Sequence, residues 1–401
     1  MAQLTTAKKR LTAIFLILAG LTMRGPIVAL PMFLEPLAQA LHKNVGELGV
    51  LTSLPLLMFV FVSSAVSLLV EKFGLTRTMQ LGVGLIVMGC IFRLIVTWPT
   101  TLVGSLLIGA GIAVLNISMP TLVAEVFPSK PGIFTTAYSA AMVVGSTLLV
   151  FIEPFVAAAW SWHVMLWIMC AISAIPCVLS FALPELKIEG KRAATRRNAK
   201  LRLLTDRRAW LFIGMFGGQS FLSYTLGAWL PSMMNADHVD MLNYSVIMVL
   251  FNTIGIPVSL VVPLFVARTR RRFHIYLIGT MTAIQIAIIM MYGWHSLIGP
   301  AYWYLFSLIT CVFFTTIFVM ILTYYPMKAA EPADAADISG LSQSFGYLLA
   351  AIGPLLYGVI YSDSLPGVSL AWVMAGIVIV NAWCSWQVVR INKFGLSTVK
   401  R

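Results

Sequence analysis

Long apolar runs recur along almost the whole chain and constrain its fold more than any other feature. We count twelve runs of about 20 residues, the length that crosses the hydrocarbon core of a bilayer as an α-helix. Their predicted limits are 11–34, 47–70, 78–97, 101–124, 133–157, 162–183, 210–234, 242–266, 274–293, 299–325, 337–361 and 368–389. Hydrophobic residues make up 60% of the chain and charged residues 10%, whereas soluble domains have about 25% charged residues. We therefore predict an all-α integral membrane protein with twelve transmembrane helices, and not a β-barrel of short alternating strands.

The basic residues predict how the chain is oriented in the membrane. The net charge is +13, and most Lys and Arg residues fall in every second connection between the apolar runs. These segments are 8–10, 72–77, 130, 187–208, 268–272, 328 and 390–401. Such an excess marks the cytoplasmic side, so both termini are expected in the cytoplasm and the protein in the inner membrane. Because the basic clusters flank spans and lack interleaved aromatic residues, we do not expect nucleic-acid binding.

The longest connection divides the apolar runs into two sets of six. We predict an N-terminal six-helix bundle at 1–183, a cytoplasmic linker at 184–209 and a C-terminal six-helix bundle at 210–401. The linker reads as a solvated segment, with a short amphipathic helix on the membrane surface as the alternative. Basic residues directly follow the second and the eighth run, in SLLVEKFGLTR and PLFVARTRRR. Such corresponding positions predict two pseudo-symmetric halves, as in a large class of transporters.

Arg24 is the residue with the clearest functional meaning. It lies near the middle of the first run, LTAIFLILAGLTMRGPIVALPMFL, which contains no acid. A charged group at bilayer depth costs at least about 2.5 kcal/mol on the mildest scale. Gly25 and Pro26 follow it and loosen the helix. We interpret Arg24 as a buried cation that attracts an anion.

Neutral polar residues near the centres of other runs are expected to orient the substrate beside Arg24. Their oxygens can accept hydrogen bonds from a guanidinium without neutralising its charge. The predicted substrate-binding residues are Arg24, Asn116, Tyr138, Gln219, Tyr224, Gln343 and Tyr347. For Asn252 and Gln285, an ordinary hydrogen bond between helices is the favoured interpretation.

Charged residues near the ends of runs suggest gates. Glu71, Lys72 and Arg77 are predicted to form a cytoplasmic gate, and Arg93 and Glu153 an ion pair near the outer ends of their spans. No acid lies at mid-depth, which argues against a carrier of organic cations. No motif of an enzyme occurs, and neither His nor Cys residues show the spacing of a metal site. We therefore expect no enzyme activity, no metal and no organic cofactor.

Several of these segments resemble a known family. SLLVEKFGLTR at 67–77 is similar to the loop motif GxxxDRxGRR of the major facilitator superfamily, with Ser67 and Glu71 in place of Gly and Asp. LTMRGPI at 21–27 resembles the LxLRP motif of one branch, the cyanate permease and nitroimidazole transporter family. Similar matches are GIAVLNISMPTLVAEVFP at 111–128, GGQSFLSYTLGAWLP at 217–231 and SGLSQSFGYLLAAIGPLLYG at 339–358. In the second half Ala267 replaces the acid of the loop motif, so a charge relay through that acid is absent there.

The resemblance implies a secondary active transporter that moves a small anion or a small polar organic molecule by alternating access. The partners expected are a small-molecule substrate, the membrane lipid and, as an open alternative for the coupling ion, protons. It also implies a monomer. A proton-driven exporter of drug-like or small organic compounds is the alternative function.

Overall fold

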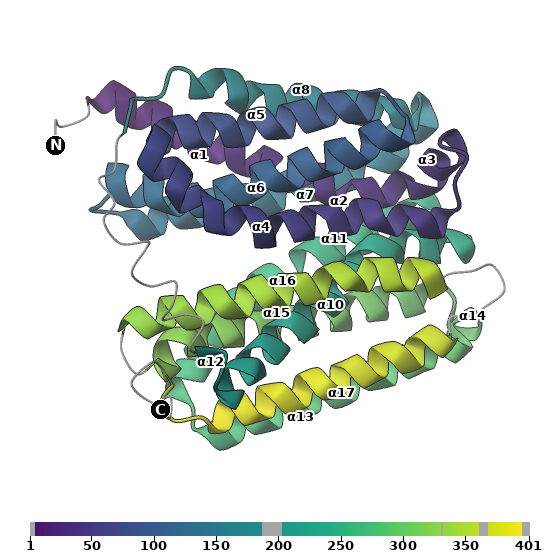
Figure 1. The fold of residues 1–401 in the computed structure, drawn as a ribbon. Coiled ribbons are helices and arrows are strands. Elements are labelled where there is room, and N and C mark those ends of the chain that lie inside the picture. The colour runs from purple at the N-terminus through teal and green to yellow at the C-terminus, as the bar shows by residue number, and fades with distance from the viewer. Residues whose placement is uncertain (1–4, 187–202, 330–331, 361–367, 395–401) are drawn as a thin grey trace. The chain divides into compact units, whose positions relative to one another are not determined.

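The computed structural model describes residues 5–186, 203–329, 332–360 and 368–394. These residues are helical apart from short connections, and the described part contains no β-strand beyond an isolated bridge between Ala329 and Phe394. The chain divides into two compact units, Met1–Ala193 and Ala194–Arg401. Figure 1 shows the helices of each unit, and we describe the units one at a time.

Unit 1 contains the first six predicted spans. The first span is broken into four elements, whereas each of the next five is formed by one long α-helix. The elements are α1 (Thr6–Met23), α2 (Gly25–Val28), η1 (Leu30–Phe33), α3 (Leu34–Ala40), η2 (Val45–Leu48), α4 (Gly49–Phe73), α5 (Leu75–Leu94), α6 (Trp98–Val126), α7 (Pro131–Ala159) and α8 (Trp162–Ser180).

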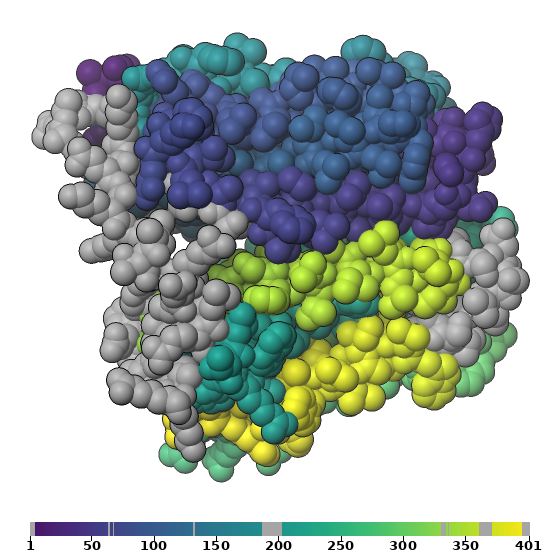
Figure 2. Space-filling model, in the orientation of Figure 1, coloured from purple at the N-terminus to yellow at the C-terminus, as the bar shows by residue number. Residues whose placement is uncertain are grey.

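Unit 2 contains the remaining six. Here the eighth span is broken before Gly255, and the ninth passes from an α-helix into a 3-10 helix at Met291. The elements are α10 (Arg207–Ala236), α11 (Met241–Thr253), α12 (Gly255–Arg268), α13 (Arg271–Met290), η4 (Met291–Trp294), α14 (His295–Ile298), α15 (Pro300–Lys328), α16 (Pro332–Ile360) and α17 (Val368–Arg390). In Figure 2 the side chains of α16 and α17 cover much of the visible face of this unit.

Eleven helical segments of the described part are long and apolar enough to cross a membrane. The remaining predicted span, 210–234, is α10, a helix of 30 residues. Polar residues such as Gln219 and Ser220 make this helix less apolar than the others. It packs against α15, α16 and α17, so most of its side chains are covered by protein. Twelve helical spans are therefore consistent with the structure, and the predicted all-α membrane fold is confirmed.

The two units repeat the same packing pattern. In unit 1 the first span packs against the fifth (α1–α7) and the sixth (α1–α8). The third span packs against the fourth (α5–α6) and the sixth (α5–α8), and the second packs against the fourth (α4–α6). In unit 2 the corresponding pairs are α10–α16, α10–α17, α13–α15, α13–α17 and the packing of α11 and α12 on α15. The prediction of two pseudo-symmetric six-helix bundles is thus confirmed.

Glycines allow the closest crossings in both units. A Cβ atom at Gly145 on α7 would lie 1.9 Å from the Leu21 carbonyl oxygen of α1. A Cβ atom at Gly346 on α16 would lie 2.4 Å from the Phe216 ring and 3.2 Å from the Cα of Gly217 on α10. Small residues let helix backbones approach closely and so maximise van der Waals contact within a membrane.

The predicted linker falls mostly outside the described residues, as does the alternative of an amphipathic helix within it. Its first residues dock on the start of α5. The Thr76 hydroxyl donates to the Pro184 carbonyl at 2.6 Å and accepts from the Leu186 N–H at 3.0 Å. The Leu75 N–H donates to the Leu186 carbonyl at 2.9 Å.

Candidate functional site

Arg24 lies at a break in the first span. Helix α1 ends at Met23 and α2 begins at Gly25, so Arg24 caps both. Pro26 has no N–H and cannot continue the hydrogen-bond ladder of α1, which explains why the helix breaks here. The Arg24 side chain is exposed on unit 1, and no hydrogen bond or ion pair from the described residues reaches it. The guanidinium therefore has no carboxylate partner there, but unit 1 by itself does not bury it.

One face of the first span is left uncovered by unit 1. Ile14 is 51% exposed and Ile17 is 41% exposed, and Arg24 follows ten and seven residues later. These spacings place the three residues on one side of a helix. The opposite side, with Phe15 and Ala19 fully buried, belongs to the packing on α7 and α8. Arg24 is thus presented on an apolar face that the rest of its unit does not fill.

The other two predicted site residues of unit 1 lie on neighbouring helices. Asn116 is exposed on α6, beside the exposed Ile117. Tyr138 is buried on α7 at the crossing with α1, where a Cβ atom at Gly20 would lie 2.7 Å from its carbonyl oxygen. No hydrogen bond joins Arg24, Asn116 and Tyr138 to one another within the described part of unit 1.

In unit 2 the structure brings two predicted site residues into contact. Tyr224 on α10 and Tyr347 on α16 meet edge to face, with ring centroids 6.2 Å apart. Phe216 adds a second edge-to-face contact with Tyr347 at 5.2 Å. Such geometry is favourable for aromatic pairs. The three rings form an aromatic cluster next to the glycine crossing of α10 and α16.

The two glutamines of unit 2 have different surroundings. Gln219 is 6% exposed, and its side-chain oxygen accepts from the Ser220 hydroxyl at 3.0 Å. Gln343 is half-buried and donates to the Ser339 hydroxyl at 2.7 Å. Gln343 lies one helical turn before Tyr347, so both belong to the same face of α16. Amide and phenol groups of this kind can orient a polar ligand without supplying charge.

Arg93 and Glu153 do not form the expected ion pair. Arg93 on α5 is 4% exposed and donates from Nη1 to the Pro26 carbonyl at 2.6 Å and from Nη2 to the Ser105 hydroxyl at 2.8 Å. Glu153 on α7 is also 4% exposed, and no described residue forms a hydrogen bond or ion pair with it. The expectation was wrong because neutral backbone and hydroxyl oxygens accept from both Nη atoms of Arg93, while its Nε has no partner among the described residues.

The residues predicted for a gate lie on the surface of unit 1. Glu71 and Lys72 are exposed in the last turn of α4, and the Lys72 ammonium lies 5.2 Å from the centre of the Phe73 ring. Arg77 pairs with Glu185, at 3.0 Å, and both side chains are about two-thirds exposed, at 65% and 66%. The pairing of Arg77 with the start of the linker was not anticipated from the sequence.

Several interior polar residues play structural parts. Gln285 on α13 donates to the Thr310 hydroxyl of α15 at 3.1 Å, which confirms the predicted bond between helices. Asn252 differs, because it donates to the Met248 carbonyl of its own helix at 2.8 Å. Asn381 was missed, although it is fully buried on α17 and donates to the Met215 carbonyl of α10 at 2.7 Å. A lone Asn within an apolar run was the available signal.

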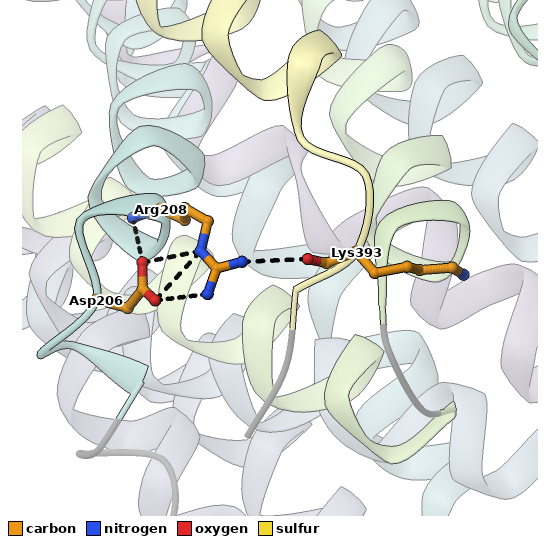
Figure 3. A network of polar contacts seen from close by, with 3 residues as sticks. All are labelled: Asp206, Arg208 and Lys393. Carbon is orange, nitrogen blue, oxygen red and sulfur yellow. Dashed lines mark hydrogen bonds and ion pairs between the residues drawn. The ribbon is translucent and has the colours of Figure 1, made fainter. Parts of the chain in front are cut away.

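A basic network closes one end of unit 2, where α10 begins and α15 and α17 end. Figure 3 shows Arg208 held by Asp206 at 2.7 Å and donating to the Lys393 carbonyl at 3.3 Å. Hydrogen bonds from Arg208 hold the pKa of the Asp206 carboxyl below its usual range. Lys328 donates to the Val389 carbonyl of α17, while Lys393 donates to the Met327 carbonyl of α15. Lys328 therefore bonds a carbonyl left without a helical partner at the end of α17, and Lys393 bonds one at the end of α15.

The chemistry available is that of binding. Among the described residues no group of three His, Cys, Asp or Glu side chains could hold a metal ion. The five cysteines are all free. Unit 1 offers an exposed guanidinium, and unit 2 offers a cluster of aromatic and amide side chains that are buried or half-buried.

Comparisons with known proteins support a transporter. The chain is 26% identical over 372 residues to the uncharacterized transporter YycB of Bacillus subtilis (strain 168), covering 92% of this chain and 89% of that one. It is 26% identical over 355 residues to a 2-nitroimidazole transporter of Escherichia coli (strain K12), covering 86% and 87%. It is 23% identical over 357 residues to the cyanate transport protein CynX of the same strain, covering 87% and 89%.

The fold comparison agrees. A crystal structure of a D-xylose-proton symporter superposes with a TM-score of 0.78 at 13% identity, covering 96% of this chain and 98% of that one. The family model described as Major Facilitator Superfamily matches residues 11–354. The resemblance inferred from the span motifs is therefore confirmed, and this multi-pass membrane protein belongs to the Major Facilitator Superfamily of transporters.

Proposed function

We propose that the chain is a secondary active transporter of a small anion, and that Arg24 binds the anion. The observation that carries this proposal is the side chain of Arg24, exposed on an apolar face without a hydrogen bond or ion pair from the described residues. A guanidinium in apolar surroundings attracts a counterion, and its planar fork suits a planar oxyanion or a carboxylate. The relatives named for 2-nitroimidazole and cyanate indicate that small polar solutes suit this branch.

The neutral residues would complete the substrate site. Tyr138 and Asn116 lie on helices that contact α1, and the aromatic cluster of Tyr224 and Tyr347 lies with Gln219 and Gln343 on α10 and α16. We propose that these six side chains orient the substrate while Arg24 supplies the charge. The two pseudo-symmetric bundles would alternate access to the site by moving relative to each other.

The remaining topological expectations belong to the same proposal. The basic end of unit 2, with Arg208, Lys328 and Lys393, would lie in the cytoplasm together with both termini, as the positive-inside rule demands. Glu71, Lys72 and Arg77 would then take part in a cytoplasmic gate in which Glu185 is a further partner. We further propose that the transporter works as a monomer in the inner membrane and has a linker at 184–209.

A binding screen tests the role of Arg24 directly. Purified protein is heated with cyanate, nitrite, bicarbonate, acetate or 2-nitroimidazole, and the ligand that raises the melting temperature of the wild type is identified. Arg24→Gln should then lose at least about 30-fold in affinity, because removing one side of a desolvated charged contact costs about 2–5 kcal/mol. Arg10→Gln is the matched control, since it removes an exposed arginine of the same helix, α1, that belongs to neither the proposed site nor the gate. Equal affinities of Arg24→Gln and wild type for every anion would exclude the proposed role.

A proton-driven exporter of small organic compounds is the second candidate. The buried Glu153, which has no cationic partner among the described residues, favours it, because a buried carboxyl without a partner is most easily accommodated with a proton. Proteoliposomes loaded with 2-nitroimidazole distinguish the two functions. Efflux that follows the pH gradient and disappears in Glu153→Gln, but survives Arg24→Gln, would favour the exporter.

A further inference from the structure

The break that carries Arg24 is held in place by a second arginine from another helix. Helix α2 has four residues, and its Pro26 carbonyl accepts a hydrogen bond from Arg93 Nη1 at 2.6 Å. We propose that Arg93 is a positioning residue of the anion site, which fixes the break and adds positive charge behind Arg24. This inference rests on the proposed function in one respect, namely that Arg24 faces an anion.

The surroundings of Arg93 are built to hold its guanidinium. Nη2 donates to the Ser105 hydroxyl at 2.8 Å, and that hydroxyl donates its own proton to the Thr101 carbonyl at 2.8 Å. The free lone pairs of Ser105 are therefore directed at Arg93. A Cβ atom at Gly104 would lie 2.9 Å from the Arg93 Cγ, so this glycine leaves room for the arginine stem between α5 and α6.

The Arg93 guanidinium is hydrogen-bonded through Nη1 and Nη2, its Nε has no partner among the described residues, and its charge is not cancelled. Both of its hydrogen-bond acceptors are neutral oxygens, and the described residues of unit 1 place no carboxylate within ion-pair distance. Pro26 is two residues from Arg24, so their Cα atoms lie within about 7.6 Å of each other. Two charges therefore raise the electrostatic potential around Arg24. The Arg24 guanidinium can contact a ligand itself, whereas Arg93 lies behind it and bonds the break between α1 and α2.

The bond has two separable consequences. It fixes the direction in which Arg24 leaves the broken helix, because Pro26 can shift only if the bond to Arg93 breaks. It also raises the local potential: a unit charge roughly 10 Å away, at an effective dielectric constant of about 20, changes the affinity for an anion by about tenfold. A purely structural arginine would also add its charge to this potential, but its replacement by lysine would leave the affinity for an anion unchanged.

A labelling experiment separates these roles without relying on transport. A thiol introduced by Ile17→Cys lies on the exposed face with Arg24, in a background where the five native cysteines are replaced by alanine. Anionic and cationic thiosulfonate reagents of matched size are applied, and the ratio of their labelling rates reports the local potential. Arg93→Gln should lower the anionic-to-cationic ratio several-fold and weaken cyanate binding about tenfold.

Two further variants divide the effect into charge and position. Arg93→Lys keeps the charge but cannot hold both acceptors as the fork does, so the labelling ratio should persist while cyanate affinity falls. Ser105→Ala removes the Nη2 partner and leaves the Pro26 bond, so it should leave the ratio unchanged and is the matched control.

The outcomes remain decisive if cyanate is not the substrate. A ratio that falls in Arg24→Gln but stays at the wild-type value in Arg93→Gln would overturn the inference and leave the proposed function intact. A ratio that falls in both variants would support the inference even without cyanate binding. Should Arg93→Gln fail to reach the membrane, Arg93→Lys decides: in that variant, wild-type affinity for the anion that raises the melting temperature of the wild type would refute a positioning role.

Discussion

The two units share one helix arrangement but differ in where they place charge. The interior of unit 1 holds Arg93 and Glu153, and its first span presents Arg24. Unit 2 also buries charged side chains, namely Lys328, Asp334 and Asp337, but these lie where α15 ends and α16 begins. Further along its spans it uses neutral groups such as Gln219 and Gln285. Pseudo-symmetry therefore applies to the packing of the helices and not to the electrostatics. Under the proposed function, the charge of the substrate site would come from unit 1.

The link between the third and fourth spans of each half makes the contrast concrete. In unit 1 it is the charged bond from Arg93 to Ser105, and in unit 2 it is the neutral bond from Gln285 to Thr310. Either bond can hold two helices together, so packing alone does not call for a guanidinium. The extra charge in unit 1 needs another explanation, which the anion site would provide.

The largest effects are expected where the two units are most alike, at the glycine crossings. Gly145→Ala places a Cβ atom 1.9 Å from a backbone oxygen of Leu21, which cannot turn away. Gly346→Ala meets the Phe216 ring at 2.4 Å and backbone atoms of Gly217 only at 3.2 Å, so its severe clash is with a side chain and not with the backbone. We expect a loss of about 3 kcal/mol in the free energy of unfolding for Gly145→Ala and about 1 kcal/mol for Gly346→Ala. Reversible unfolding in mixed micelles measures both.

Matched glycines provide the control for this prediction. Gly84 on α5 and Gly376 on α17 have no atom within 4 Å of an added Cβ. Alanine at these sites should be neutral or stabilising by up to about 1 kcal/mol, since alanine favours helices. If all four substitutions had the same effect, helix propensity and not close approach would govern these sites.

A smaller effect tests the contrast between the charged and the neutral link. In a double-mutant cycle, Gln285→Met and Thr310→Val should show a coupling energy of about 0.6 kcal/mol, typical of hydrogen bonds between membrane helices. Arg93→Met and Ser105→Ala should show about 1.5–3 kcal/mol, because hydrogen bonds to charged groups are stronger. The free energy of unfolding of each single and double variant gives these values. Coupling energies that agree within error would remove the energetic distinction between the units.

Much of the fold could be predicted from the sequence. The apolar runs predict twelve spans, and for most of them the helix limits differ from the prediction by only a few residues. The less apolar α10 was also identified, since its polar residues interrupt a run that is still long enough. The breaks in the first and eighth spans were harder to place. Gly25–Pro26 and Gly255 with Pro257 signal such breaks, but these signals do not say how the freed carbonyls are satisfied.

The candidate site was predicted less completely, because its contacts join residues far apart in the chain. The residue types of Tyr224 and Tyr347 suggested a polar site, whereas their contact depends on the crossing of α10 with α16. From charge alone, the sequence suggested Glu153 as the ion-pair partner of Arg93. In the structure Arg93 instead bonds the Pro26 carbonyl, 67 residues away, and every residue carries such an acceptor. Charge complementarity is visible in a sequence, but the choice among backbone acceptors is not.

The smallest expected effect concerns the ends of the two units and depends on pH. In unit 2, Arg208 lowers the pKa of Asp206, so the pair stabilises the fold at pH values above the ordinary carboxyl pKa of about 3.9. That contribution is lost as the pH falls through the lowered pKa in the folded state. Asp206 also caps α10, accepting from the Arg208 N–H at 2.8 Å. Asp206→Asn keeps a good cap and removes only the ion pair.

We expect Asp206→Asn to lower the free energy of unfolding by about 0.2–1 kcal/mol at pH 7 and low salt, and we expect this loss to shrink as the pH falls through the lowered pKa of Asp206. In unit 1, Glu185→Gln should change little at any pH, because its pair with Arg77 is about two-thirds exposed. Melting temperatures of the three proteins between pH 7 and pH 2 measure this difference. An equal loss in both variants would mean that the partly buried network at the end of unit 2 gives no advantage over an exposed ion pair, and that the contrast between the units is confined to their interiors.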